Sequence, residues 1–223
     1  MIESLVVNTV ATVYVDWMSD LQASSQAGQR GPTDHSIRDQ IIEAADQHFS
    51  HYGYGKTTVA DLAKAIGFSK AYIYKFFDSK QAIGEAICSR CLGSVATSAE
   101  AAVSGGKTAT DKFRRLFKSI STLSSELFFN DRKLYDIAAY SCAEKWPSSE
   151  AYVELVGKMV TDIIQEGRAS GEFERKTPID EAVRAILQVM QPFMNPVMLQ
   201  YNLDAIPEGA NEVASLVLRS LAP

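Results

Sequence analysis

The side chains best suited to chemistry are concentrated in residues 69–80. Ammonium and phenol groups there can donate hydrogen bonds to phosphate oxygens, and lysine can also donate to the O6 and N7 atoms of guanine. Asp78 is the only acidic residue of this stretch, although the whole chain has a net charge of -5. A local basic surface that binds an anion is therefore expected on an acidic protein. Its donors are Lys70, Tyr72, Tyr74, Lys75 and Lys80.

Cysteine and histidine pairs offer a second kind of chemistry. Cys88 and Cys91 are three residues apart, as are His48 and His51, so each pair would share one face of a helix. Neither has the further ligands that complete a zinc site, so we expect no metal. The cysteines could instead sense redox state, or be buried as small apolar side chains. No nucleophile elbow, phosphate-binding loop or zinc-protease motif is present, so we expect neither an enzyme nor a cofactor.

Three helices are predicted to position the basic stretch, within residues 36–82. Apolar residues at a helical spacing indicate the first of them, up to about residue 52. Thr58 and Asp61 form a capping-box pattern at the start of the second helix, and Gly67 allows a sharp turn at its end. Ser69 is suited to cap the third helix. The pattern is that of a helix-turn-helix, whose last helix enters the major groove of DNA.

The N-terminal part of the third helix would lie nearest the base edges. Lys70 can reach guanine or a phosphate there, and the small side chain of Ala71 permits contact with a thymine methyl. Tyrosine hydroxyls suit phosphate oxygens, and helix starts favour anions through their free N–H groups. The predicted DNA-binding residues are Thr57, Thr58, Ser69, Lys70, Ala71, Tyr72, Tyr74, Lys75 and Lys80.

The rest of the chain reads as helical, and we predict an all-α fold. Residues 1–35 form an extension and linker, in which 3–21 has the spacing of an amphipathic helix, although a floppy extension is an equal alternative. Residues 83–223 form a larger helical domain. The segment 179–201 is apolar on several sides, so another surface must bury it, either the domain core or a second copy. Pro192 and Pro196 must kink or break that segment.

Composition limits the class of protein. The chain has 223 residues, of which 46% are hydrophobic and 22% charged, as expected for a packed core. Three cysteines are too few and too uneven for a disulfide framework, which favours a reducing compartment. No stretch has the length of a membrane span. We therefore expect a cytoplasmic protein with no membrane partner.

Residues 36–87 resemble the N-terminal DNA-binding domain of the TetR/AcrR family of bacterial transcriptional regulators. One departure is Phe76, where many members have histidine, because phenylalanine cannot donate to a phosphate or a base edge. The resemblance rests on Ile41, Ala44, Phe49, Gly53, Thr57, Thr58, Val59, Asp61, Leu62, Ala63, Gly67, Ser69, Lys70, Ile73, Tyr74, Phe77, Ser79, Lys80 and Ile83.

The resemblance implies a repressor that binds a near-palindromic operator as a homodimer and is released by a small-molecule effector. It places the dimer interface on the last two long helices, about 179–201 and 209–221, and a ligand pocket within the helical domain. An adaptable pocket of this kind favours aromatic and methionine side chains. The candidate liners are Phe113, Phe117, Phe128, Tyr135, Tyr140, Trp146, Met190, Phe193 and Met194.

Two other classes of function fit an all-helical chain. A helical adaptor could use the same tyrosines to bind a protein, in which case its binding would be insensitive to salt. An all-helical enzyme would require a deep pocket with paired carboxylates whose pKa values are shifted.

Overall fold

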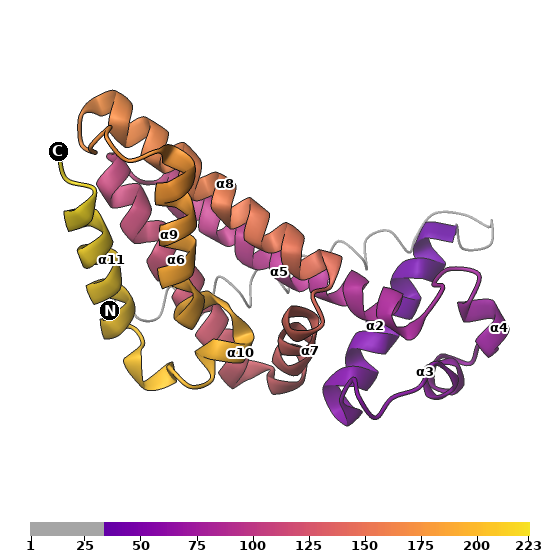
Figure 1. Ribbon diagram of the computed structural model, residues 1–223. Helices are drawn as coiled ribbons and strands as arrows, with labels where there is room; N and C mark the ends of the chain where they lie inside the picture. The colour runs from indigo at the N-terminus through magenta and orange to yellow at the C-terminus, as the bar shows by residue number, and fades with distance from the viewer. Residues whose placement is uncertain (1–33) are drawn as a thin grey trace. The chain divides into compact units, whose positions relative to one another are not determined.

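A computed structural model describes residues 34–223, and every regular element in that range is helical (Figure 1). The all-α prediction is therefore confirmed for this part of the chain. The predicted helix at 3–21 and the linker that follows it lie outside the described residues. Asp39–Pro223 form one compact unit. The predicted domain boundary at residue 82 falls inside this unit and remains a prediction.

The first three helices form the predicted helix-turn-helix: α2 (Asp34–Tyr52), α3 (Val59–Ile66) and α4 (Lys70–Ile73). The Thr58 hydroxyl accepts the Asp61 N–H at 3.2 Å, and the Asp61 carboxylate accepts the Thr58 N–H at 2.9 Å. These bonds are the two halves of a capping box. Gly67 ends α3 with a left-handed φ of 77°. The Ser69 hydroxyl accepts the Tyr72 N–H at 3.1 Å, which caps α4 as predicted.

Helix α4 is only four residues long. Beyond Ile73 the N–H of Lys75 donates to the carbonyl of Tyr72, and the N–H of Phe76 donates to the carbonyl of Ile73. These bonds span three residues, the tighter pattern that often follows an α-helix. Ile73 and Phe77 are buried, so the segment is anchored from within. Lys75 therefore projects from a turn and not from a regular helix.

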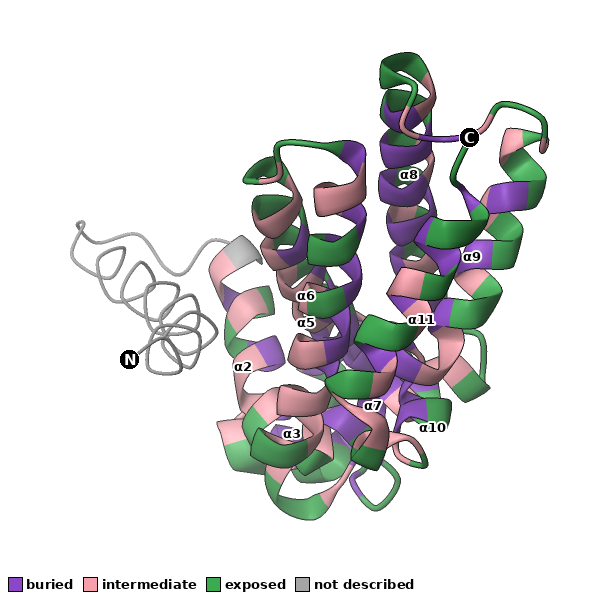
Figure 2. Cartoon of the chain, turned by 90° about the vertical axis from the view of Figure 1, so that its left-hand side faces the viewer, coloured by how far each residue is buried: buried purple, intermediate pink, exposed green. Residues whose placement is uncertain are grey.

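The core of the larger region is built by α5 (Lys80–Ser104), α6 (Ala109–Asn130) and α8 (Pro147–Ser170), with α7 (Arg132–Ala143) beside them. Serine and threonine caps start α5 and α6, because Ser79 accepts the Ala82 N–H and Thr108 accepts the Asp111 N–H. Helix α8 is buried along much of its length (Figure 2). The side chains at the centre of this core include Leu116, Phe117, Ile120, Val156, Val160 and Ile164.

The predicted segment 179–201 is divided into two helices, which is one of the two outcomes expected from its prolines. Helix α9 (Ile179–Met194) contains Pro192, but Pro196 begins the separate short helix α10 (Pro196–Leu199). Proline disfavours the helical conformation of the residue before it, and Asn195 is accordingly extended. The Asn195 side chain accepts the Val197 N–H at 2.9 Å and so caps α10. The 3-10 turn η1 (Leu203–Ala205) and α11 (Glu208–Ser220) complete the chain.

Glu172, in the connection after α8, ties that loop to the start of α6. Its two carboxylate oxygens accept the N–H groups of Ala109 and Thr110, both at 3.1 Å. The bond from the Thr110 N–H is the main cause that lowers the pKa of Glu172. Two of the free N–H groups in the first turn of α6 are thus satisfied by a residue distant in sequence.

Candidate DNA-binding surface and internal cavity

The short helix α4 exposes the predicted DNA-binding side chains together. Ser69, Lys70, Ala71, Tyr74 and Lys75 are exposed, whereas Tyr72 is half-buried. Ile73 is fully buried, so the helix has one inner and one outer face. The structure therefore brings the cationic and phenolic donors of residues 69–75 onto one surface.

Aromatic rings support both lysines of this surface. The Lys70 Nζ lies 5.7 Å from the centre of the Tyr74 ring, and the Lys75 Nζ lies 5.5 Å from that of Tyr72. At exposed sites such contacts contribute about 0.5–1 kcal/mol, which is weak enough for the ammonium groups to exchange a ring for a phosphate. The Tyr72 ring itself packs edge-on against Phe68, at 5.0 Å, and Phe76, at 5.4 Å. Phe76 therefore orients Tyr72 by ring packing, a role that was not predicted from the sequence, where Phe76 was considered only as a possible DNA contact.

The structure gives Thr57 and Lys80 internal partners. Thr57 is buried, and its hydroxyl donates to the Gly53 carbonyl at 2.9 Å. The Lys80 Nζ donates to the carbonyls of Tyr54 and Thr57, both at 3.1 Å, and lies 4.2 Å from the centre of the Tyr54 ring. Burial lowers the pKa of the Lys80 ammonium. These two side chains therefore hold the loop before α3 against the start of α5, while Thr58 lies exposed at the surface.

An aromatic cluster connects this loop to α5 and to the α7–α8 turn. The Tyr54 ring lies 5.3 Å from that of Tyr140 and 5.4 Å from that of Trp146, and the latter two rings are 5.6 Å apart. Gly84 of α5 faces them, and a Cβ there would come within 2.9 Å of both Trp146 and Tyr54. Tyr140 and Trp146, predicted as pocket liners, belong to this cluster.

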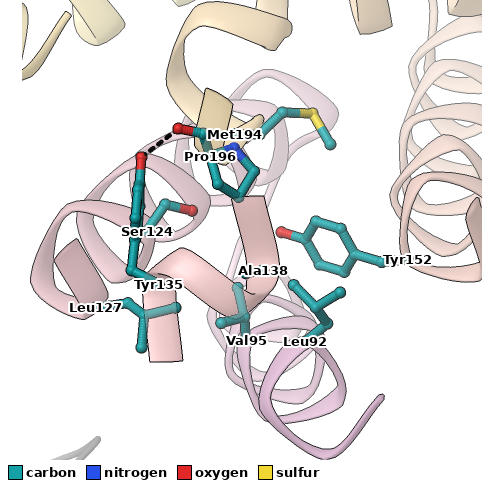
Figure 3. Close-up of a pocket in the computed structure, with 9 residues that line it drawn as sticks. All are labelled: Leu92, Val95, Ser124, Leu127, Tyr135, Ala138, Tyr152, Met194 and Pro196. Atoms are coloured by element: carbon teal, nitrogen blue, oxygen red, sulfur yellow. Dashed lines mark hydrogen bonds between the residues drawn. The ribbon is translucent and has the colours of Figure 1, made fainter. Parts of the chain in front are cut away.

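Two small cavities lie between helices α5 to α10, with volumes of about 10 and 20 Å³. Each has room for about one water molecule. Leu92, Tyr152, Met194 and Pro196 line both of them (Figure 3). The first is further lined by Val95, Ser124, Leu127, Tyr135 and Ala138, and the second by Cys142, Ser149, Val153, Gln191 and Asn195.

Among the predicted pocket liners, Tyr135 and Met194 border these cavities. Phe113, Phe117, Met190 and Phe193 are instead buried in the main core. Phe128 packs edge-on against Tyr135, with ring centres 4.9 Å apart. Among the residues that line both cavities, the prediction missed Leu92, Tyr152 and Pro196. Tyr152 could have been predicted to line a pocket, because it places a hydroxyl on the buried face of α8, which continues at Val156 and Val160.

The cysteines show no sign of activated thiols. Burial is the main cause that raises the pKa of Cys88 and of Cys91 to about 12, and that of Cys142 to about 11. Thiols with raised pKa values form little thiolate, the form that reacts with oxidants. Within residues 34–223 no group of three or more His, Cys, Asp or Glu side chains could hold a metal ion. None of the helices in that range has both the length and the apolar character needed to cross a bilayer.

Comparison with protein families matches two parts of the chain. Residues 41–87 match the family described as bacterial regulatory proteins, tetR family. Residues 109–213 match the family described as tetracyclin repressor-like, C-terminal domain. The first match covers α3, α4 and most of α2, and the second extends from α6 into α11.

Individual relatives agree with these matches. The chain is 45% identical over 49 residues to IcaR of Staphylococcus aureus, a biofilm operon negative transcriptional regulator, and this match spans 22% of the chain but only 26% of that protein. It is 27% identical over 158 residues to the transcriptional repressor KstR2 of Mycolicibacterium smegmatis, covering 68% of the chain and 74% of the relative. The solved structure of the regulator PfmR from Thermus thermophilus is similar at a TM-score of 0.53, with 25% identity, 80% of this chain and 97% of that one covered.

Proposed function

We propose that this chain, which belongs to the TetR family of bacterial regulatory proteins, is a DNA-binding transcriptional repressor controlled by a small-molecule effector. The family is one of regulators, so the all-helical enzyme considered above is not retained. Repression is favoured because the names of two relatives, IcaR and KstR2, describe a negative regulator and a repressor.

The observation that carries DNA binding is the exposed surface of α4. It presents Lys70, Ala71 and Tyr74 beside one another, and α4 contains no acidic residue. Such a surface suits the major groove, which carries phosphates on its walls and base acceptors on its floor. We assign Lys70 and Ala71 to base edges, and Lys75, Tyr72 and Tyr74 to phosphates and sugars. Ser69 and Thr58 hold the helix starts, while Thr57 and Lys80 position the motif from within.

The test is fluorescence anisotropy with DNA from the chain's own promoter at several salt concentrations. We expect Lys70→Ala combined with Tyr74→Ala to abolish specific binding. Each phosphate contact contributes about 0.9 to the slope of log affinity against log salt. If Lys75 contacts a phosphate in both copies of a dimer, Lys75→Ala should reduce that slope by about 2.

Lys118 offers a matched control, because it is an exposed lysine on α6. Lys118→Ala should leave both affinity and slope unchanged. Equal binding by the wild type and the Lys70/Tyr74 double variant would contradict the assignment of α4. Binding that is indifferent to salt would instead favour the protein-binding adaptor.

We also propose that the protein acts as a homodimer through α9 and α11. Val189 on α9 and Leu216 on α11 are exposed by 43% and 59% of their surfaces, although both helices also contribute buried apolar residues to the core. Exposed apolar side chains on neighbouring helices favour an interface, and a twofold pair of such helices forms a four-helix bundle. Dimers also match the two half-sites of a palindromic operator.

Light scattering coupled to gel filtration tests the dimer. Leu216→Glu should yield monomers, because it would place a charge in the middle of an apolar contact. Phe129→Glu is the control, since Phe129 is equally apolar and 70% exposed at the end of α6. A dimeric Leu216→Glu protein, or a monomeric wild type, would contradict this interface.

The effector is proposed to bind at the two small cavities that Tyr152 of α8 and Pro196 of α10 line. Helix α7 supports this proposal because its residues belong both to the wall of a cavity and to the aromatic cluster around Tyr54. Tyr135 and Ala138 line a cavity, while Tyr140 belongs to the cluster around Tyr54. A ligand that displaces α7 would therefore disturb the loop that precedes α3. Titration of purified cell extracts against the protein–DNA complex, followed by mass spectrometry of retained molecules, would identify the effector class.

A further inference from the structure

One polar group points into the cavities without a partner. Tyr152 is 7% exposed, and its hydroxyl has no hydrogen-bond partner among the described residues. Figure 3 shows this hydroxyl directed from α8 into the space bordered by Leu92, Ala138, Met194 and Pro196. A buried hydroxyl without a partner costs free energy, because it has lost its hydrogen bonds to water. Such a group calls for an occupant or a water molecule.

Tyr135 in the same cavity provides the contrast. Its hydroxyl donates to the Pro196 carbonyl at 2.5 Å, the dashed bond in Figure 3. Two tyrosines thus border one space, but only Tyr135 is satisfied by the described part of the protein. The bond also joins α7 to α10 across one side of the cavity, so it helps to close the space around the Tyr152 hydroxyl.

The cavity walls exclude a charged ligand group. Among the described residues, no Asp, Glu, Lys, Arg or His lines either cavity. An ion buried there would lose its hydration without a counter-charge. Burial also raises the pKa of Tyr152, so its phenol stays protonated and able to donate at neutral pH. The polar side chains in the second cavity are already engaged in part, because Asn195 donates to Gln191 at 3.1 Å.

We propose that the cavity binds a neutral, mainly apolar molecule that has one hydrogen-bond acceptor oxygen, such as a ketone or an ester, and that the Tyr152 hydroxyl donates to this oxygen. The inference rests on the proposed function, in which this region receives the effector. It adds the chemical class of that molecule and the residue that selects it.

The size of the cavities shows that the surrounding helices must move for such a ligand to enter. Volumes of about 10 and 20 Å³ do not accommodate an organic molecule. Pro196 lines both cavities and begins α10, which is separated from α9 by the extended Asn195. Movement of α10 away from α8 would merge the two spaces, and it would stretch the Tyr135–Pro196 bond. In the proposed binding event, this bond would transmit the movement of α10 to α7.

The test uses three probes of similar skeleton and the full chain. Acetophenone carries a neutral acceptor, ethylbenzene has none, and benzoate is charged. Their dissociation constants are measured by NMR titration for the wild type, Tyr152→Phe and Tyr135→Phe. We expect the wild type to prefer acetophenone over ethylbenzene by about 2- to 10-fold, the ratio for one neutral hydrogen bond, and to bind benzoate most weakly.

The variants separate the proposed role from general packing. Tyr152→Phe should lose the preference for acetophenone and should melt no lower than the wild type, because it removes an unsatisfied hydroxyl. Tyr135→Phe should keep the preference but melt at a lower temperature, since it removes a satisfied bond. A preference retained by Tyr152→Phe, tighter binding of benzoate, or no binding of any probe would overturn the proposal.

The melting temperature of Tyr152→Phe and DNA binding in the absence of any probe complete the test. A lower melting temperature for Tyr152→Phe would show that its hydroxyl binds a structural water, and it would also overturn the proposal. Operator binding without any probe is measured in parallel for the wild type and Tyr152→Phe. If the wild type does not bind DNA, the proposed function as a regulator is refuted. If it binds DNA normally but shows no preference for acetophenone, only this inference is refuted.

Discussion

Gly84→Ala tests the packing between the DNA-binding helices and the rest of the chain. A Cβ at Gly84 would lie 2.9 Å from the Cη2 and Cζ3 atoms of Trp146 and from the Cε2 atom of Tyr54. These atoms belong to rigid rings, which cannot give way as the end of a flexible side chain could. Overpacking of this kind costs about 1–3 kcal/mol.

The same substitution also removes a helical glycine, which alone would stabilise α5 by about 1 kcal/mol. Gly93 isolates this contribution, because it lies on the same helix and a Cβ added there would meet no heavy atom within 4 Å. We therefore expect Gly93→Ala to stabilise the protein by about 1 kcal/mol. Gly84→Ala should be less stable than Gly93→Ala by about 1–3 kcal/mol, the cost of the clash alone.

The assay is urea unfolding followed by circular dichroism, at equal protein concentrations because the stability of the proposed dimer would depend on concentration. Trp146→Phe in the Gly84→Ala background should recover part of the loss, and a double-mutant cycle measures that coupling. Equal stability of Gly84→Ala and Gly93→Ala would refute the close packing at this junction. The affinity of Gly84→Ala for DNA should also fall, since Tyr54 lies in the loop before α3.

The remaining predictions concern stability. Burial raises the pKa of Asp46 to about 6, although the Arg90 guanidinium lies 3.4 Å from its carboxylate. The stabilisation of the fold by the protonated Asp46 is therefore complete below about pH 4 and is lost as the pH rises through 6. Asp46→Asn should remove this dependence, which is worth up to about 3 kcal/mol, in urea unfolding at several pH values. The pKa of Glu172 is lowered chiefly by the hydrogen bond from the Thr110 N–H. Its contribution to the stability of the fold is therefore present above the usual pKa range of glutamate and is lost as the pH falls. Glu172→Gln should lower the melting temperature at neutral pH, and this difference should vanish in melting curves recorded in acid. Gly67→Ala should cost about 1–2 kcal/mol in urea unfolding, because alanine is strained at a φ of 77° and no neighbour would be touched.

Local hydrogen bonds explain why the helix-turn-helix could be predicted from sequence. The caps at Thr58, Ser69 and Ser79 each bond to a backbone N–H three residues later, so residue type and spacing suffice. Gly67 was likewise predictable, since a left-handed residue after a helix favours glycine. These caps and this turn depend almost entirely on residues that are neighbours in the sequence.

The internal roles of Lys80 and of the pocket residues could not be predicted in this way. The carbonyls that accept from Lys80 belong to Tyr54 and Thr57, which the fold brings to it from the other side of the motif. An apolar side chain such as Phe113 favours a core and a pocket equally, and only the packing of several helices decides between them. Pro196 was expected either to kink or to break its helix, but the extended Asn195 that follows from the break became visible only in the structure.

The two bonds of Lys80 fix the loop before α3 to the start of α5, so a rotation of α5 would move the DNA-binding helices with it. Leu92 borders both cavities on the same helix, and at 1.5 Å per residue it lies about 18 Å from Lys80. Rotation of α5 by about 10° around Leu92 would swing the Lys80 end through an arc of about 3 Å. That arc is close to the rise of one base pair, about 3.4 Å. In the proposed dimer, a tilt of this size in each copy would shift the two α4 helices out of register with two operator half-sites, without any change in the side chains proposed to touch DNA.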